Sequence, residues 1–205
     1  MPESVGLREQ EKARVRRELM DAALRLFERQ GYEQTTVQQI ADAVRVSRRT
    51  FHRHFPSKAA VVFGHEEDLV AFLLAAMDRR PPEESALTAL RGALRELLVH
   101  EPDAEQRREQ AATVRRARQV LITNPELRQE NFTGAVLRRH VLAEHFARRA
   151  GLAEADLRTQ VAAAACFAAL GVGLDHWVVN TDGSLSALHE TLDGAIATLQ
   201  DGLDV

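Results

Sequence analysis

The feature that most constrains this fold is a pair of short helical patterns in residues 35–58, TTVQQIADAVRVSRRTFHRHFPSK. The first helix is predicted to begin at Thr36, because Thr36 and Gln39 stand at the spacing of a capping box. Its apolar residues recur at the spacing of one helix face: Val37, Ile40, Ala41 and Val44. After a tight break at Arg45, Ser47 is placed to cap a second helix that ends near Pro56.

The second helix is predicted to have one apolar and one basic face. Phe51 and Phe55 are four residues apart, so both are expected to point inward. The polar residues are left on the outside: Arg48, Arg49, Thr50, His52, Arg53 and His54. A short helix, a tight turn and a second helix of this kind predict a helix-turn-helix, whose second helix enters the major groove of DNA.

This stretch resembles the DNA-binding signature of the TetR family of transcriptional regulators. The resemblance rests on VSRRTFHRHFPSK preceded by TTVQQIADAV, and on the preceding helix LMDAALRLFERQGYEQTT, so it covers about residues 14–63. The run SRRTF with FPSK is also similar to a subgroup linked to mycofactocin-type regulators. The sequence departs from the family pattern at three positions. Glycine is usual where Arg45 stands, a small residue or proline is common where Arg49 stands, and a phosphate-binding tyrosine is usual where His52 stands.

The resemblance implies a homodimeric repressor that binds a palindromic operator and is released by a small-molecule ligand, which we expect to be apolar or amphipathic. The distribution of charged residues agrees with a DNA-binding N-terminal part and a separate ligand-binding part. Residues 1–63 hold 12 Lys and Arg against 8 Asp and Glu, whereas residues 64–205 hold 15 against 22. A basic N-terminal module on an acidic body indicates that only the first module meets a polyanion.

The remainder of the chain predicts an all-α fold with a three-helix N-terminal domain and a larger helical C-terminal domain. The first helix should begin at Arg14, after a polar tail. Later helices are expected at about 58–77, 87–101, 104–123, 126–149, 155–179 and 184–203. We place the DNA-binding domain at 1–57 and the ligand-binding and dimerisation domain at 58–205.

The last two helices are the predicted dimer interface. The run AAAACFAALGVG in helix 155–179 carries almost no charge, so we expect that helix to be buried nearly all round. Two consecutive apolar helices can pair with the same two helices of a second subunit as a four-helix bundle. A two-fold dimer also suits two recognition helices about one turn of DNA apart. The alternative is that both helices fill the core of a monomer.

Several other classes of protein are not indicated. No apolar run reaches the ~18 residues of a membrane span, and the N-terminus lacks the apolar core of a signal peptide, so we expect a cytoplasmic protein. The usual motifs of nucleotide-binding, zinc-peptidase and serine-hydrolase enzymes are missing, and no cofactor or metal is expected. The single cysteine, Cys166, is expected to be an inert core thiol. The alternative function is a helical small-molecule-binding protein without DNA-binding activity.

Two sets of site residues follow. Arg48, Arg49, Thr50 and His52 are expected to reach base edges, and residues at helix N-termini to contact phosphates. The predicted DNA-binding residues are Arg17, Thr35, Thr36, Ser47, Arg48, Arg49, Thr50, His52, Arg53, His54 and Lys58. The predicted ligand-binding residues are Phe63, Leu73, Met77, Val120, Leu121, Phe132, Val136 and Trp177. Arginines in helix 104–123 are expected either to form a solvated face or to hold an anionic ligand.

Overall fold

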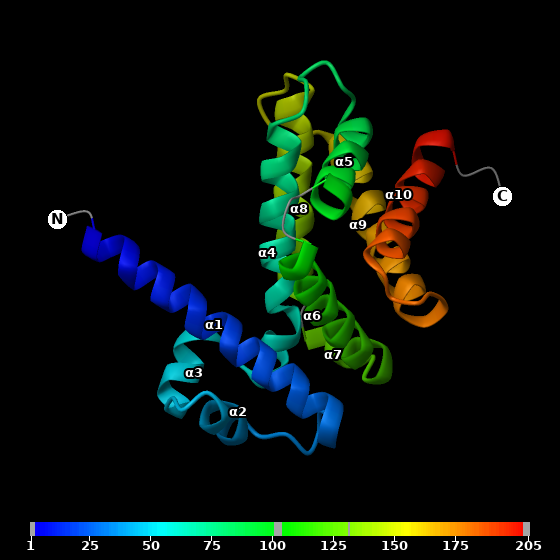
Figure 1. Cartoon of the computed structure of the whole chain (residues 1–205). Coiled ribbons are helices and arrows are strands. Elements are labelled where there is room, and N and C mark those ends of the chain that lie inside the picture. The colour runs from blue at the N-terminus through cyan, green and yellow to red at the C-terminus, as the bar shows by residue number, and fades with distance from the viewer. Residues whose placement is uncertain (1–2, 101–103, 131, 203–205) are drawn as a thin grey trace. The chain divides into compact units, whose positions relative to one another are not determined.

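The regular structure of the described chain is helical. A computed structural model describes residues 3–100, 104–130 and 132–202. The helices are α1 (Glu3–Gln30), α2 (Val37–Ala43), α3 (Arg48–His54), α4 (Lys58–Asp78), α5 (Ala86–Arg95), a π-helical segment (Glu96–His100), α6 (Ala104–Thr123), α7 (Leu127–Glu130), α8 (Phe132–Arg149), α9 (Leu157–Asn180) and α10 (Leu185–Asp201) (Figure 1). The all-α prediction is confirmed for the described residues, and both α7 and α8 fall within the helix expected at 126–149, with residue 131 between them outside the described residues.

The described residues form two compact units. The first takes its residues from 1–65 and 116–131, and the second from 66–115 and 132–205. Along the chain, α4 and α6 each contribute residues to both units. This division differs from a boundary after residue 57, because the start of α4 and the end of α6 pack with the first unit. The boundary itself stays a prediction.

The core of the first unit is made by more than its three N-terminal helices. Phe51, Phe55 and Ile40 are buried together with the apolar face of α1. The same core contains apolar residues from α6 and α7: Ala117, Val120, Leu121 and Leu127. These later residues follow the end of α3 by 63 to 73 positions in sequence, so helical periodicity alone could not assign them to this core.

The first helix is longer than the sequence predicted. It begins at Glu3 rather than Arg14, so the expected polar tail is helical. Arg14 pairs with Glu11 at 2.6 Å and also with Glu18. Pairs three and four residues apart stabilise an exposed helix, which explains how a stretch without an apolar face continues α1.

The second unit is built on α9 and α10, which lie side by side, with α8 packed on α9 and α5 on α10 (Figure 1). Leu188, Leu192 and Ile196 bury the inner face of α10. Gly173 permits the close approach of the two helices, because a Cβ at this position would lie 3.1 Å from the Leu192 side chain.

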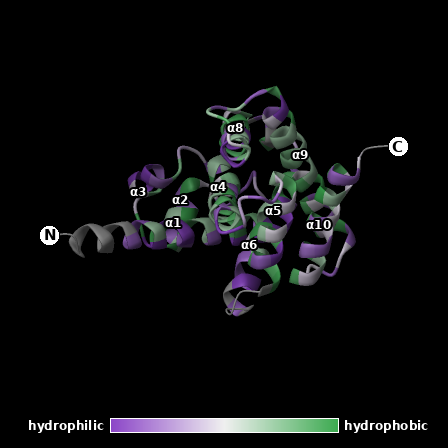
Figure 2. Ribbon diagram, turned by 90° about the horizontal axis from the view of Figure 1, so that it is seen from above, coloured by the Kyte–Doolittle hydropathy of each residue, from purple (hydrophilic) through white to green (hydrophobic). Residues whose placement is uncertain are grey.

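The prediction that this apolar helix is buried nearly all round is wrong for the described chain. Four large apolar side chains of α9 are exposed, from 59% to 77%: Leu157, Val161, Val172 and Val179. Figure 2 shows α9 with many hydrophobic positions along its length. The helix is also long and apolar enough, by length and composition alone, to cross a membrane, contrary to the sequence expectation. The core helix of a globular protein passes the same test, and α9 packs against α8 and α10.

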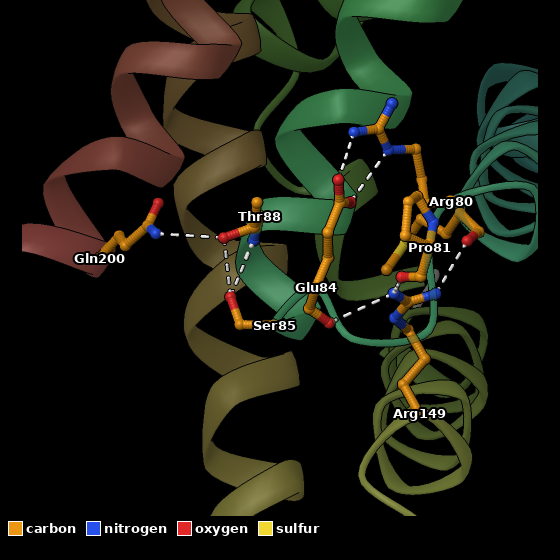
Figure 3. A network of polar contacts seen from close by, with 8 residues as sticks. Arg80, Pro81, Glu84, Ser85, Thr88, Arg149 and Gln200 are labelled. Atoms are coloured by element: carbon orange, nitrogen blue, oxygen red, sulfur yellow. Dashed lines mark hydrogen bonds and ion pairs between the residues drawn. The ribbon is translucent and has the colours of Figure 1, made fainter.

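A polar network fixes the connection between α4 and α5 (Figure 3). The guanidinium of Arg149 donates to the carbonyl oxygens of Met77 at 3.0 Å, Pro81 at 2.5 Å and Glu84 at 3.2 Å. Arg80 forms an ion pair with the Glu84 carboxylate at 2.5 Å, and the hydrogen bond that Arg80 donates lowers the pKa of that carboxyl. Arg149 therefore joins the end of α8 to the loop that follows α4.

We expect Arg149→Ala to lower the free energy of unfolding by about 1–2 kcal/mol, because backbone carbonyls lose charge-assisted hydrogen bonds at a partly exposed site. Urea unfolding of the full chain measures the change. Arg139→Ala, at an exposed position of the same helix, is the control and should shift unfolding by less than about 0.5 kcal/mol. If both substitutions lower the free energy of unfolding equally, the conclusion that Arg149 stabilises the loop after α4 is wrong.

Candidate DNA-binding site

The first helix of the predicted pair begins with the expected capping box. Thr36 Oγ1 accepts a hydrogen bond from the backbone N–H of Gln39 at 3.2 Å, and Gln39 Oε1 accepts one from the N–H of Thr36 at 2.8 Å. Two backbone donors at the start of α2 are thus satisfied reciprocally. This confirms the predicted start of the helix and fixes its direction toward the turn.

The turn between α2 and α3 keeps a tight geometry without a glycine. Arg45 has a φ of 58°, in the left-handed region, and it is the one non-glycine residue of the described chain with a positive φ. Its N–H donates to Asp42 O at 3.0 Å, and the N–H of Val46 donates to Ala41 O at 3.0 Å. These bonds close the end of α2 and return the chain toward α3.

The second helix is oriented by its two phenylalanines. The Ser47 hydroxyl caps α3, accepting from the N–H of Thr50 at 3.1 Å, as predicted. Phe51 and Phe55 are 0% and 2% exposed, with ring centroids 5.8 Å apart. Arg16 of α1 lies over the Phe55 ring at 5.0 Å and donates to the carbonyl of Gly64. Burial of one face therefore turns the opposite face of α3 to the solvent.

That outer face is basic. The exposed residues of α3 are Arg48, Arg49, His52 and Arg53, while Thr50 and His54 are half-buried. The helix holds no acidic residue, and Figure 2 shows much of it as hydrophilic. A helix with three exposed arginines and a buried aromatic back has the chemistry for phosphate and base contacts in a major groove.

His54 differs from the exposed residues of its helix. Burial, followed by the positive charges of Arg53, Lys12 and Arg16, holds its pKa below the usual range. Neither ring nitrogen has a hydrogen-bond partner among the described residues. The ring is therefore neutral near pH 7, when it adds no positive charge to the face of α3.

Two of the predicted phosphate contacts already have structural partners. The hydroxyl of Thr35 is buried and donates to Gly31 O at 2.8 Å. Lys58 Nζ donates to Tyr32 O at 2.7 Å and lies 4.0 Å from the centroid of the Tyr32 ring. Both side chains thus hold the loop between α1 and α2. Thr36 and Arg17 are exposed, and the DNA contacts assigned to all four residues stay predictions.

The second unit contains an apolar cavity of about 230 Å³. Its lining residues come from α4, α5, the π-helical segment, α6, α9 and α10. Two of them are polar, Arg107 and Gln110, and both belong to α6. Its apolar lining residues are Leu69, Phe72, Leu73, Leu94, Leu97, Leu98, Ala111, Val114, Leu170, Leu174, Leu185, Leu188 and Leu192. Mostly apolar walls with a few polar groups are typical of a small-molecule site.

The residues predicted to bind a ligand are not gathered in one place. Only Leu73 lines this cavity. Phe63, Val120 and Leu121 belong to the core of the first unit. The others lie in the second unit: Met77 and Trp177 are buried, and Phe132 and Val136 are exposed. Sequence reasoning missed the leucines of α5 and α10 as a cavity lining, because they were assigned to ordinary helix packing.

Two arginines of α6 have structural partners instead of forming a solvated face. Arg115 donates to Asp182 O at 3.2 Å, and its guanidinium lies 5.9 Å from the centroid of the Trp177 ring. Arg116 pairs with Glu28 at 3.5 Å within the first unit. Neighbouring residues of one helix thus belong to different units.

Cys166 is fully buried in α9, and burial raises the pKa of its thiol to about 12. A thiol with so high a pKa is not a nucleophile at neutral pH, which agrees with the predicted inert role. Among the residues that the structure describes, no three His, Cys, Asp or Glu side chains are grouped as a metal site.

Comparison with known proteins gives the family. Residues 19–63 match the model of bacterial regulatory proteins of the tetR family, and residues 84–204 match the MftR C-terminal domain. The HTH-type transcriptional regulator TcmR of Streptomyces glaucescens is 34% identical over 203 residues, covering 98% of this chain and 90% of TcmR. A protein of Mycobacterium tuberculosis named as a mycofactocin biosynthesis transcriptional regulator, MftR, is 30% identical over 91% of this chain and 89% of its own length.

Among solved structures, the repressor FadR of Thermus thermophilus, in complex with lauroyl-CoA, has a TM-score of 0.57 at 24% identity, covering 93% of this chain and 95% of FadR. The helix-turn-helix and these matches define a DNA-binding transcriptional regulator. The chain belongs to the TetR family and carries a C-terminal domain of the MftR type. This is a family of regulators and not of enzymes, as the sequence predicted.

We predict that Arg49 reads a base. An arginine can donate two hydrogen bonds to guanine, which gives about 1–3 kcal/mol of discrimination. Arg49→Ala should therefore reduce the ratio of random-sequence to operator Kd by about 5–150-fold for each subunit bound, while the Kd for random duplexes changes little. Fluorescence anisotropy on both duplexes measures the ratio, and Arg139→Ala is the control. A ratio equal to that of the wild type would contradict this role.

Proposed function

We propose that the chain is a ligand-responsive repressor that binds a palindromic operator as a homodimer and leaves it when a small molecule occupies the second unit. The observation that carries this proposal is the apolar cavity of about 230 Å³ on the same chain as a basic helix-turn-helix. A regulator of this kind acts on chromosomal DNA, so we place it in the cytoplasm.

The cavity suggests the chemistry of the effector. Drug-sized ligands occupy pockets of about 300–1,000 Å³, so this cavity suits a compact apolar molecule or the apolar end of a longer one. Arg107 and Gln110 offer hydrogen-bond donors for a polar end. The effector is thus apolar or amphipathic. The lauroyl-CoA in the FadR structure is an amphipathic molecule of this general kind and is a reasonable first probe.

Dimerisation through α9 and α10 is supported by the exposed apolar side chains of α9. Leu157, Val161, Val172 and Val179 recur on one helix face and are left uncovered in the single chain. Val172 also lines a shallow hollow between α9 and α10, to which α10 contributes the small residues Gly194 and Ala195; its other lining residues are Gly173, His176, Glu190 and Thr191. A second copy packed on this face by two-fold symmetry would cover the apolar residues of both subunits.

Two helices offer a route from effector to DNA. Leu69 and Leu73 of α4 line the cavity, and Val61, eight residues earlier than Leu69, belongs to the core of the first unit. Similarly, Val114 of α6 lines the cavity and Leu121 belongs to that core. We propose that the bound effector tilts α4 and changes the separation of the two recognition helices in the dimer. An effector acts only through a difference in its affinity for the two dimer geometries.

Because effector and operator bind the same protein, each must change the affinity for the other by the same factor, and this reciprocity tests the proposal. A coupling of about 1–3 kcal/mol would weaken operator binding about 5–150-fold, and the operator must weaken effector binding by the same factor. Isothermal calorimetry of lauroyl-CoA, and then of other apolar and amphipathic compounds that bind the chain, is compared with and without operator DNA. Ala111→Leu, which adds volume to the cavity wall, should abolish the effector response and leave operator affinity unchanged. Equal effector affinity in both titrations would contradict the switch.

A further inference from the structure

The strained residue of the described chain lies at the DNA-binding turn. Arg45 is held at a φ of 58°, where an L side chain is crowded against its own backbone and glycine fits without cost. Strain of this kind persists where the surrounding structure imposes it, and it gathers at functional sites. The four other described residues with positive φ are glycines: Gly31, Gly151, Gly183 and Gly202.

The packing of the turn does not explain an arginine. Arg45 is exposed, and its side chain has no hydrogen bond or ion pair among the described residues. The nearest acidic residue in sequence, Asp42, accepts a hydrogen bond from Gln38 Nε2 at 2.7 Å instead. The bonds that close the turn use only backbone atoms, so glycine would make them equally well. Among the described residues, no contact of the guanidinium accounts for an arginine at this position.

Arg45 lies next to the helix that carries the basic face. It precedes the α3 cap, Ser47, by two residues, so their Cα atoms are at most about 8 Å apart. The exposed residues Arg48 and Arg49 directly follow Ser47. Arg45 therefore adds a further positive charge beside the N-terminal end of α3, which is the end of a recognition helix that contacts DNA. We propose that Arg45 is a DNA phosphate-binding residue, and that an arginine stands at this strained backbone position because its guanidinium neutralises a DNA phosphate. The inference rests on the DNA-binding function and does not depend on the effector response.

Three substitutions separate charge from strain in the full-length chain. Arg45→Gly removes both the charge and the strain. Arg45→Gln removes the charge and keeps the strained backbone, and Arg45→Lys keeps both. Tm is measured by thermal unfolding, and Kd is measured between about 50 and 200 mM salt on operator and random-sequence duplexes of equal length.

The substitutions should change Tm and the salt dependence of Kd independently of each other. Arg45→Gly should raise Tm by about 1–4 °C, since relief of strain outweighs the greater freedom of glycine in the unfolded chain, while Gln and Lys should leave Tm nearly unchanged. Gly and Gln should each reduce the slope of log K against log[salt] by about 0.9 for each subunit bound, on both duplexes. Each lost contact corresponds to about an 8-fold weaker affinity at 0.1 M salt. Arg45→Lys should keep the wild-type slope.

Arg139→Gln, at an exposed position of α8, is the matched control for loss of an arginine and should leave the slope unchanged. Wild-type affinity and slope for Arg45→Gly and Arg45→Gln would overturn the inference and leave the DNA-binding function intact. A loss confined to operator DNA would assign Arg45 to base reading and also overturn it. A lower Tm for Arg45→Gly would refute the strain on which it rests. A wild-type chain that binds neither duplex would overturn both this inference and the proposed function.

Discussion

The burial of Phe51 and Phe55 is the interaction on which the DNA-binding unit depends. Seven residues are too few for a helix to be stable alone in water, so α3 exists because its apolar side is packed. Full burial of an aromatic side chain is favourable by about 1.5–3 kcal/mol. Because these two residues fix which side of α3 is inside, they also fix which arginines are outside. The orientation of the basic face is thus a consequence of hydrophobic packing.

This packing also explains why the helix-turn-helix could be predicted from sequence. Its signals are local: the capping box of Thr36 and Gln39, the Ser47 cap and the four-residue spacing of the phenylalanines all act within one or two helical turns. The left-handed turn at Arg45 could not be predicted in the same way, because arginine carries no preference for positive φ. The helical patterns predicted a tight break at Arg45, and only the resemblance to a family with glycine at this position indicated a positive φ there.

What the sequence did not predict depends on tertiary contacts. The apolar residues at the end of α6 have the same helical period as those that line the cavity, so periodicity could not distinguish Leu121 in one core from Val114 in another. The low charge of α9 indicated burial, yet composition cannot say which faces a neighbouring helix covers. Sequence position likewise could not predict that Lys58 and Thr35 donate to the carbonyls of Tyr32 and Gly31, and the phosphate contacts assigned to both residues stay predictions.

The central claim is that two copies of the basic α3 face read DNA together. Selection of bound duplexes from a random library by the wild-type chain tests it most directly, because one experiment reports binding, symmetry and spacing. The account predicts a palindromic consensus whose half-sites are about one helical turn, 34–36 Å, apart, as expected for two recognition helices related by a two-fold axis. Recovery of no consensus, or of a single half-site without symmetry, would contradict it.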